Sequence, residues 1–158
     1  MSRTQKLAGL GQSLWLDNIT RELLDNGTLR DYIANFSITG LTSNPTIFDE
    51  AIGGTTAYDD GIRAKALSGK SGEALFIELA LEDLRRAADL FRPVFDATDG
   101  VDGWVSMEVS PLLATDTAGS IGAAKPVHAQ ADRPTRDGER PGTTARVAAH
   151  AEGRLGGV

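Results

Sequence analysis

The stretch Gly103-Trp104-Val105-Ser106-Met107-Glu108-Val109-Ser110-Pro111 alternates apolar and polar residues. Successive side chains of a strand point to opposite faces, so three apolar side chains share one face and a carboxylate lies between two hydroxyls on the other. A central strand of an open doubly wound sheet is apolar on both faces, whereas a barrel strand can turn a polar face to the lumen. The alternation therefore favours a barrel, with a half-exposed edge strand as the alternative that the pattern leaves open.

Strands and helices alternate through the rest of the chain. Pro93 is expected to end the longest helix, and Pro126 is expected to kink or end the last one. Such alternation predicts an α/β fold of parallel β/α units with right-handed crossovers. The expected strands are 13–16, 36–45 and 105–110, and the expected helices are 19–27, 29–35, 46–52, 58–67, 71–91 and 115–130.

The length of 158 residues predicts one domain, and it falls well short of the ~250 residues of a closed eight-fold barrel. Residues 1–121 hold 18 acidic and 10 basic side chains, whereas 122–158 hold 4 acidic and 6 basic ones and no aromatic residue. Residues 122–158 have too little apolar surface to bury, so burial cannot offset the conformational entropy that this segment would lose on folding. We therefore expect a folded body over 1–134 and a poorly ordered tail over 135–158.

Three polar residues lie at or near the carboxyl ends of the expected strands, where barrel enzymes place their reacting groups: Asp17, Asn44 and Glu108. Each has a structural alternative. Asp17 or its neighbour Asn18 can cap the following helix, Asn44 before Pro45 can be a turn residue, and Glu108 can form a structural salt bridge.

Several other functions are disfavoured by composition. The chain has no cysteine, and its only two histidines, His128 and His150, lie in the compositionally different last part of the chain, so we expect no metal, no disulfide and a reducing, cytoplasmic setting. No apolar run is long enough for a signal peptide or a membrane span. The acidic body and the tail without aromatic residues argue against nucleic acid as a partner.

Three motifs together resemble a known family. SLWLDNITRELL (13–24), ITGLTSNPTIFDEAI (38–52) and WVSMEVSPLLATDT (104–117) occur in the order and spacing of bacterial-type transaldolases. The resemblance covers residues 12–134, and a full transaldolase is more than twice as long as this chain. It implies an incomplete (β/α)8 TIM-type barrel of about three to four β/α units.

The resemblance also implies an activity and roles for particular residues. Transaldolases transfer a dihydroxyacetone unit between sugar phosphates of the pentose phosphate pathway, through a lysine Schiff base and without a cofactor. Asp17 matches the aspartate that moves protons, Glu108 the glutamate that acts through a water, and Asn44, with Thr42 beside it, the asparagine that binds the three-carbon unit.

The Schiff-base lysine of the family has no counterpart in this chain. The flanks Arg133-Pro134 and Pro141-Gly142-Thr143 match the family without a gap, but the apolar strand between them reads TRDGER and Glu139 stands at the lysine position. A carboxylate cannot form an imine, so we expect the chain to be inactive as it stands.

Two explanations for the missing lysine remain open, and with them two functions. Read one nucleotide later, codons for Asp137-Gly138-Glu139 can encode Met-Val and the start of a lysine codon, so a local frame slip competes with genuine divergence. The leading interpretation is the N-terminal portion of a transaldolase that takes sugar phosphates and self-associates through open barrel edges. The alternative is a non-catalytic fragment that binds sugar phosphate or a protein partner.

Overall fold

A computed structural model describes residues 2–108, 110–113 and 115–131. Its three strands form one parallel sheet in the order β1-β2-β3, and the chain between them is helical. The elements are α1 (Arg3–Ala8), β1 (Trp15–Asp17), α2 (Arg21–Asp25), α3 (Thr28–Phe36), β2 (Gly40–Ser43), α4 (Pro45–Gly54), η1 (Thr56–Tyr58), α5 (Asp59–Leu67), α6 (Gly72–Ala97), β3 (Trp104–Met107), η2 (Pro111–Leu113) and α7 (Thr117–Ala131).

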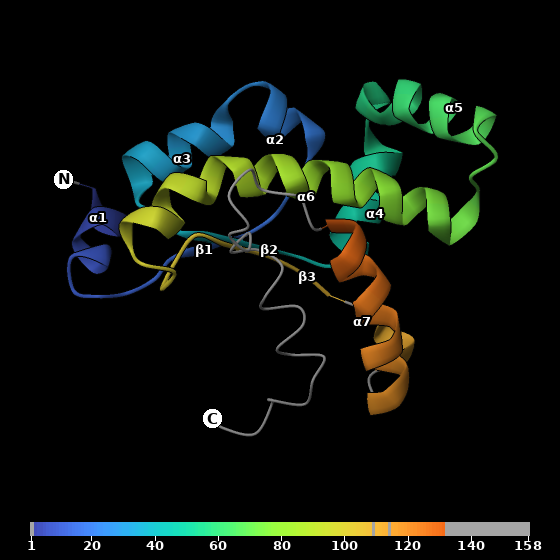
Figure 1. Cartoon of the computed structure of the whole chain (residues 1–158). Coiled ribbons are helices and arrows are strands. Elements are labelled where there is room, and N and C mark those ends of the chain that lie inside the picture. The colour runs from blue at the N-terminus through green and yellow to red at the C-terminus, as the bar shows by residue number, and fades with distance from the viewer. Residues whose placement is uncertain (1, 109, 114, 132–158) are drawn as a thin grey trace.

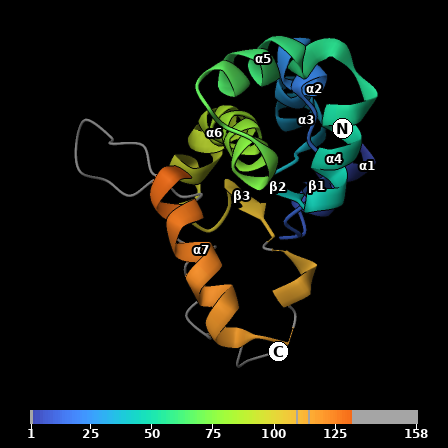
Figure 2. The ribbon, with the colours of Figure 1, turned by 90° about the vertical axis from the view of Figure 1, so that its right-hand side faces the viewer.

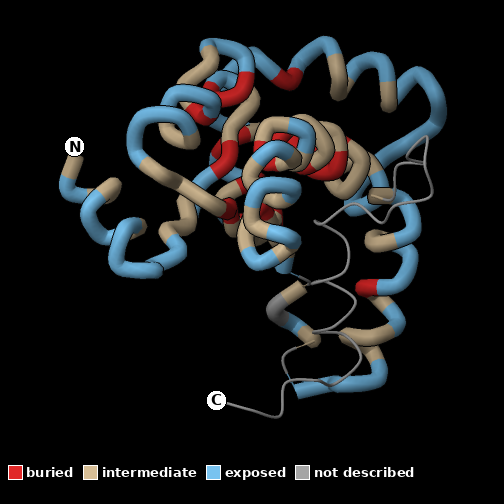
Figure 3. The backbone as a smooth tube through the Cα atoms, turned by 60° about the vertical axis from the view of Figure 1, so that its left-hand side comes forward, coloured by how far each residue is buried: buried red, intermediate tan, exposed pale blue. Residues whose placement is uncertain are grey.

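Helices cover one face of this sheet. Figure 1 shows the sheet nearly edge-on, with α2, α3 and α6 on the same side, and Figure 2 shows the same layering from one end. Leu41 of β2 and Val105 of β3 point into this layer and are buried with Phe91 of α6 and Leu29 of α3. The buried residues in Figure 3 accordingly gather between α6 and its neighbours. The α/β fold and its parallel strands are thus as the sequence predicts.

The long helix does not end where the sequence predicts. Pro93 lies inside α6, which runs on to Ala97, although an internal proline costs a helix about 3 kcal/mol. Tertiary packing offsets this cost, because Phe91 is fully buried and the Phe95 ring packs edge-on against the Trp104 ring, with 5.4 Å between the ring centroids. Pro126 likewise lies inside α7 and does not end it.

The turn between α6 and β3 depends on a glycine. Gly103 has φ of +87°, and a Cβ atom at this position would lie 2.4 Å from the backbone nitrogen of Phe95. Its N–H donates to the Thr39 carbonyl at 2.7 Å, which joins the start of β3 to the chain entering β2. This close approach brings β3 alongside β2 in register, with Ser106 opposite Thr42.

Candidate active site

Polar side chains from all three strands lie in one row across the sheet. Asp17 pairs with Thr42, and Thr42 pairs with Ser106. Neighbouring strands are about 5 Å apart and paired residues point to the same face. Leu41 and Val105, one residue earlier on their strands, point to the helices, so this row lies on the face turned away from α2, α3 and α6.

A second row follows at the carboxyl ends of β2 and β3. Asn44 directly follows β2 and Glu108 directly follows β3, so both lie at the carboxyl ends of these strands. The Glu108 N–H donates to the Ser43 carbonyl at 3.3 Å, and the buried Ser43 hydroxyl donates to the Ser106 carbonyl at 2.9 Å. These bonds hold the ends of β2 and β3 together. Asp17 and Thr42 are thus neighbours in the sheet, and Asn44 and Glu108 follow the adjacent ends of β2 and β3.

The other end of this face is aromatic. Trp15 pairs with Gly40, and its indole ring would lie 2.5 Å from a Cβ atom at position 40, so only glycine leaves room for the ring. The Trp104 indole donates to the Gly100 carbonyl at 3.0 Å. The face thus has large rings at the amino ends of the strands and hydrogen-bonding groups at the carboxyl ends.

The capping alternative for Asp17 and Asn18 is wrong. Thr20 is the N-cap of α2, and its hydroxyl accepts the Leu23 N–H at 3.0 Å. Asp17 is exposed, and its carboxylate makes no hydrogen bond or ion pair with the described residues. Its carboxylate is therefore available to a ligand or to solvent.

A purely structural role was the alternative for both Asn44 and Glu108, and within the part of the chain that the structure describes such a role is present only for Asn44. The Asn44 side-chain oxygen accepts the Ile47 N–H at 3.0 Å and caps α4, so a local structural role is present. Its amide nitrogen has no partner among the described residues and can still donate. Glu108 is exposed and forms no ion pair within the described ranges, so the salt bridge considered from the sequence is not found there.

The lysines of the chain do not lie on this face. Lys65, at the helical surface, pairs with Glu78 at 3.6 Å and with Glu82, and Lys70 pairs with Glu78 at 2.6 Å. Lys6 belongs to α1 and Lys125 to α7. The polar rows offer carboxylates, hydroxyls and an amide, which suit recognition and proton transfer on a polyol, but no amine.

Metal ligation is not a feature of the described ranges. They hold no group of three or more histidine, aspartate or glutamate side chains that could bind a metal ion. The same ranges contain no helix with the length and apolar character needed to cross a membrane.

Comparison with known proteins gives the family. A family model described as transaldolase/fructose-6-phosphate aldolase matches residues 14–153. The chain belongs to this transaldolase family. A transaldolase of Thermobifida fusca (strain YX) is 43% identical over 156 residues, which are 96% of this chain and 42% of that protein. A transaldolase of Arthrobacter sp. (strain FB24) is 45% identical over 82% of this chain and 35% of its own length.

The transaldolase match confirms the resemblance drawn from the three motifs. The chain spans between 30% and 42% of the length of the curated transaldolases that it matches. Transaldolases have a TIM-barrel fold, and the three-stranded parallel sheet is compatible with part of such a barrel. Glu139 and the expected tail over 135–158 lie outside the described residues.

Sequence reasoning missed one group of buried polar residues. Asp83 is fully buried on α6, where it accepts hydrogen bonds from Arg21 and Tyr58. The helix α6 thus carries a buried carboxylate within its packing face. One signal was present, because Asp83 lies three residues after the buried Ala80 and four before the buried Ala87, on the same helix face.

Proposed function

We propose that this chain forms the part of a transaldolase active site that lacks the Schiff-base lysine, and that it does not transfer dihydroxyacetone units by itself. The observation that carries the proposal is the placement of Asp17, Thr42, Asn44 and Glu108 at the neighbouring carboxyl ends of the three strands. In this proposal Asp17 moves a proton to and from a substrate hydroxyl, and Glu108 acts through a water. Asn44 and Thr42 hold the three-carbon unit of a sugar phosphate.

Binding of sugar phosphate tests the role of these strand ends. Titration of the isotope-labelled chain with fructose 6-phosphate is expected to shift the amide NMR signals of Asp17, Thr42, Asn44 and Glu108. Asn44→Asp is the informative variant, because aspartate keeps the oxygen that caps α4 but loses the amide donor. We expect its affinity to fall about tenfold, the equivalent of one hydrogen bond, while its free energy of unfolding changes by less than about 0.5 kcal/mol.

A matched control separates binding from folding. Thr46, an exposed residue of α4, is near Asn44 in the chain but is not one of the proposed ligands. Thr46→Ala is expected to bind as the parent does. Signal changes that avoid these strand ends, or equal affinity of Asn44→Asp and the parent chain, would count against the proposed site.

The proposed barrel portion has open edges. Within the described residues β1 and β3 each pair only with β2, so each leaves one edge unpaired. Unpaired strand edges are templates for pairing with another chain. We therefore expect the chain to self-associate, with a mass in sedimentation velocity that rises above the monomer as concentration increases. A constant monomer mass over the same concentrations would reject self-association.

A further inference from the structure

A chain of buried hydrogen bonds connects the start of α2 to η1 and α6. The backbone N–H of Arg21 donates to the Tyr58 hydroxyl at 2.9 Å, and this hydroxyl donates to Asp83 Oδ2 at 2.8 Å. Arg21 Nε donates to Asp83 Oδ1 at 3.0 Å. Tyr58 is 1% exposed and Asp83 is fully buried. The three residues thus form a closed ring of hydrogen bonds.

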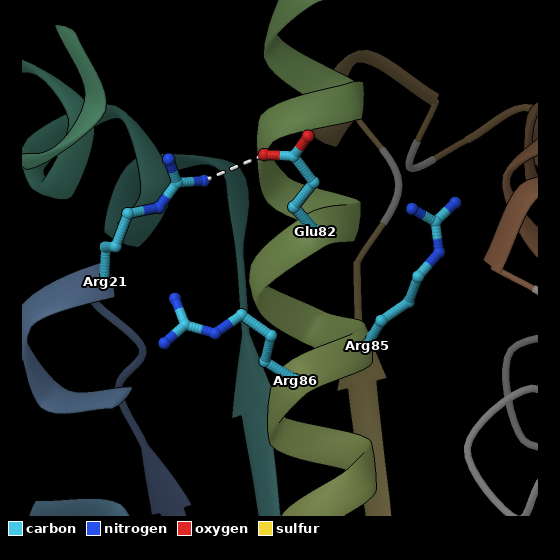
Figure 4. A pocket seen from close by; sticks show the side chains of 4 residues that line it. All are labelled: Arg21, Glu82, Arg85 and Arg86. Carbon is cyan, nitrogen blue, oxygen red and sulfur yellow. Dashed lines mark hydrogen bonds and ion pairs between the residues drawn. The ribbon is translucent and has the colours of Figure 1, made fainter. Parts of the chain in front are cut away.

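The Arg21 side chain is confined on several sides. Its guanidinium lies 4.4 Å from the centre of the Tyr58 ring and pairs with Glu82 at 3.1 Å. On α5, a Cβ atom at Gly61 would lie 3.1 Å from Arg21 Nη1. Figure 4 shows the side chain reaching from the start of α2 toward Glu82 on α6. Contacts from η1, α5 and α6 therefore fix one conformation of Arg21.

The direction of the hydrogen bonds follows from the protons available. The Tyr58 oxygen accepts the Arg21 N–H, so its single proton is directed to Asp83. Burial raises the pKa of the Tyr58 hydroxyl, and the hydrogen bond to Asp83 raises it further, so the proton stays on the tyrosine at neutral pH. Tyr58 therefore acts both as a cap for the first N–H of α2 and as a donor to the buried carboxylate.

Arg21, which belongs to this ring of hydrogen bonds, comes four residues after Asp17 in the chain. Between Asp17 and Arg21, the side chain of Ile19 is fully buried and Thr20 caps α2. Asp17 itself is held in the sheet by its pairing with Thr42. The turn that follows Asp17 is thus fixed at one end by the sheet and at the other by Arg21.

We propose that Tyr58 and Asp83 are positioning residues for Asp17: by holding Arg21 they fix the β1–α2 turn and keep the Asp17 carboxylate on the polar face of the sheet. The importance of this position rests on the proposed role of Asp17. The two residues touch neither the polar face nor a ligand on it, because they lie on the helix side of the sheet.

Hydrogen exchange measured by NMR without ligand tests the positioning role. Tyr58→Phe keeps the ring beneath Arg21 but removes both hydrogen bonds of the hydroxyl. We expect amide hydrogen exchange to accelerate over residues 18–24, which include Arg21. This acceleration should be at least about tenfold greater than that at Leu41 and Val105 in the sheet. Tyr32→Phe is the matched control, since the Tyr32 hydroxyl has no hydrogen bond among the described residues. It should leave both regions unchanged.

Two results would overturn the proposal. A uniform acceleration at Arg21, Leu41 and Val105 would mean that Tyr58 contributes only to global stability, and unchanged exchange at Arg21 would mean that its hydroxyl does not hold the turn. Asp83→Asn keeps an oxygen for Arg21 Nε but loses the acceptor of the Tyr58 proton and the negative charge, so it should show the same selective pattern as Tyr58→Phe. It provides the answer if Tyr58→Phe does not fold.

A binding measurement tests whether the β1–α2 turn affects the proposed site. Fructose 6-phosphate is expected to bind Tyr58→Phe about tenfold more weakly than Tyr32→Phe, with smaller signal shifts at Asp17. Equal affinity would reject the link between the turn and the site. If the parent chain shows no binding, the proposed function fails, whereas the exchange measurement still decides whether Tyr58 and Asp83 hold the turn.

Discussion

Asp83→Ala is expected to lower the free energy of unfolding by about 3 to 5 kcal/mol, the usual cost of removing one partner of a buried ion pair. The loss has two parts. Arg21 Nε and the Tyr58 hydroxyl each lose the acceptor that Asp83 provides, and the buried carboxylate leaves a cavity in the core. Glu82 remains beside Arg21 and keeps the cost toward the lower end of the range.

Urea unfolding followed by circular dichroism at neutral pH measures this loss. Asp49→Ala is the matched control, because Asp49 is an exposed carboxylate on a helix and its removal should change stability by less than about 0.5 kcal/mol. Equal, small effects of the two substitutions would show that the buried ring of hydrogen bonds contributes little to folding.

The polar face could be predicted because its signals are local. The alternation around Ser106 and Glu108 determines which side chains share a face, and strand ends are marked by Asp17 and by Asn44 before Pro45. Parallel pairing then brings these residues together without further information. The three motifs also gave the transaldolase family, which the comparisons confirm.

The ring of hydrogen bonds could not be predicted in the same way. Arg21 and Asp83 are 62 residues apart, and Tyr58 and Asp83 are 25 apart, so no local pattern relates them. Pro93 is a related case. Local preference places a helix end before it, but the packing of Phe91 and Phe95 on neighbouring elements carries α6 past it.

The proposed lack of a Schiff-base lysine carries the largest expected effect on activity. Removing the nucleophile of an enzyme typically lowers its rate on the order of 10⁶-fold. We expect the remaining lysines not to replace it, because two form ion pairs with Glu78 and the other two belong to α1 and α7. Sequencing the coding DNA around codon 139 distinguishes a frame slip, in which another frame encodes an apolar strand with lysine, from genuine divergence.

Borohydride trapping tests the central claim most directly. Fructose 6-phosphate forms an imine with a reactive lysine, and borohydride reduces the imine that remains after carbon–carbon cleavage to a stable amine bearing three carbons. The purified chain is treated with both reagents and its intact mass is measured beside a full-length transaldolase that gives the adduct. We expect the mass of this chain to stay unchanged. A three-carbon adduct on any of its lysines would contradict the account.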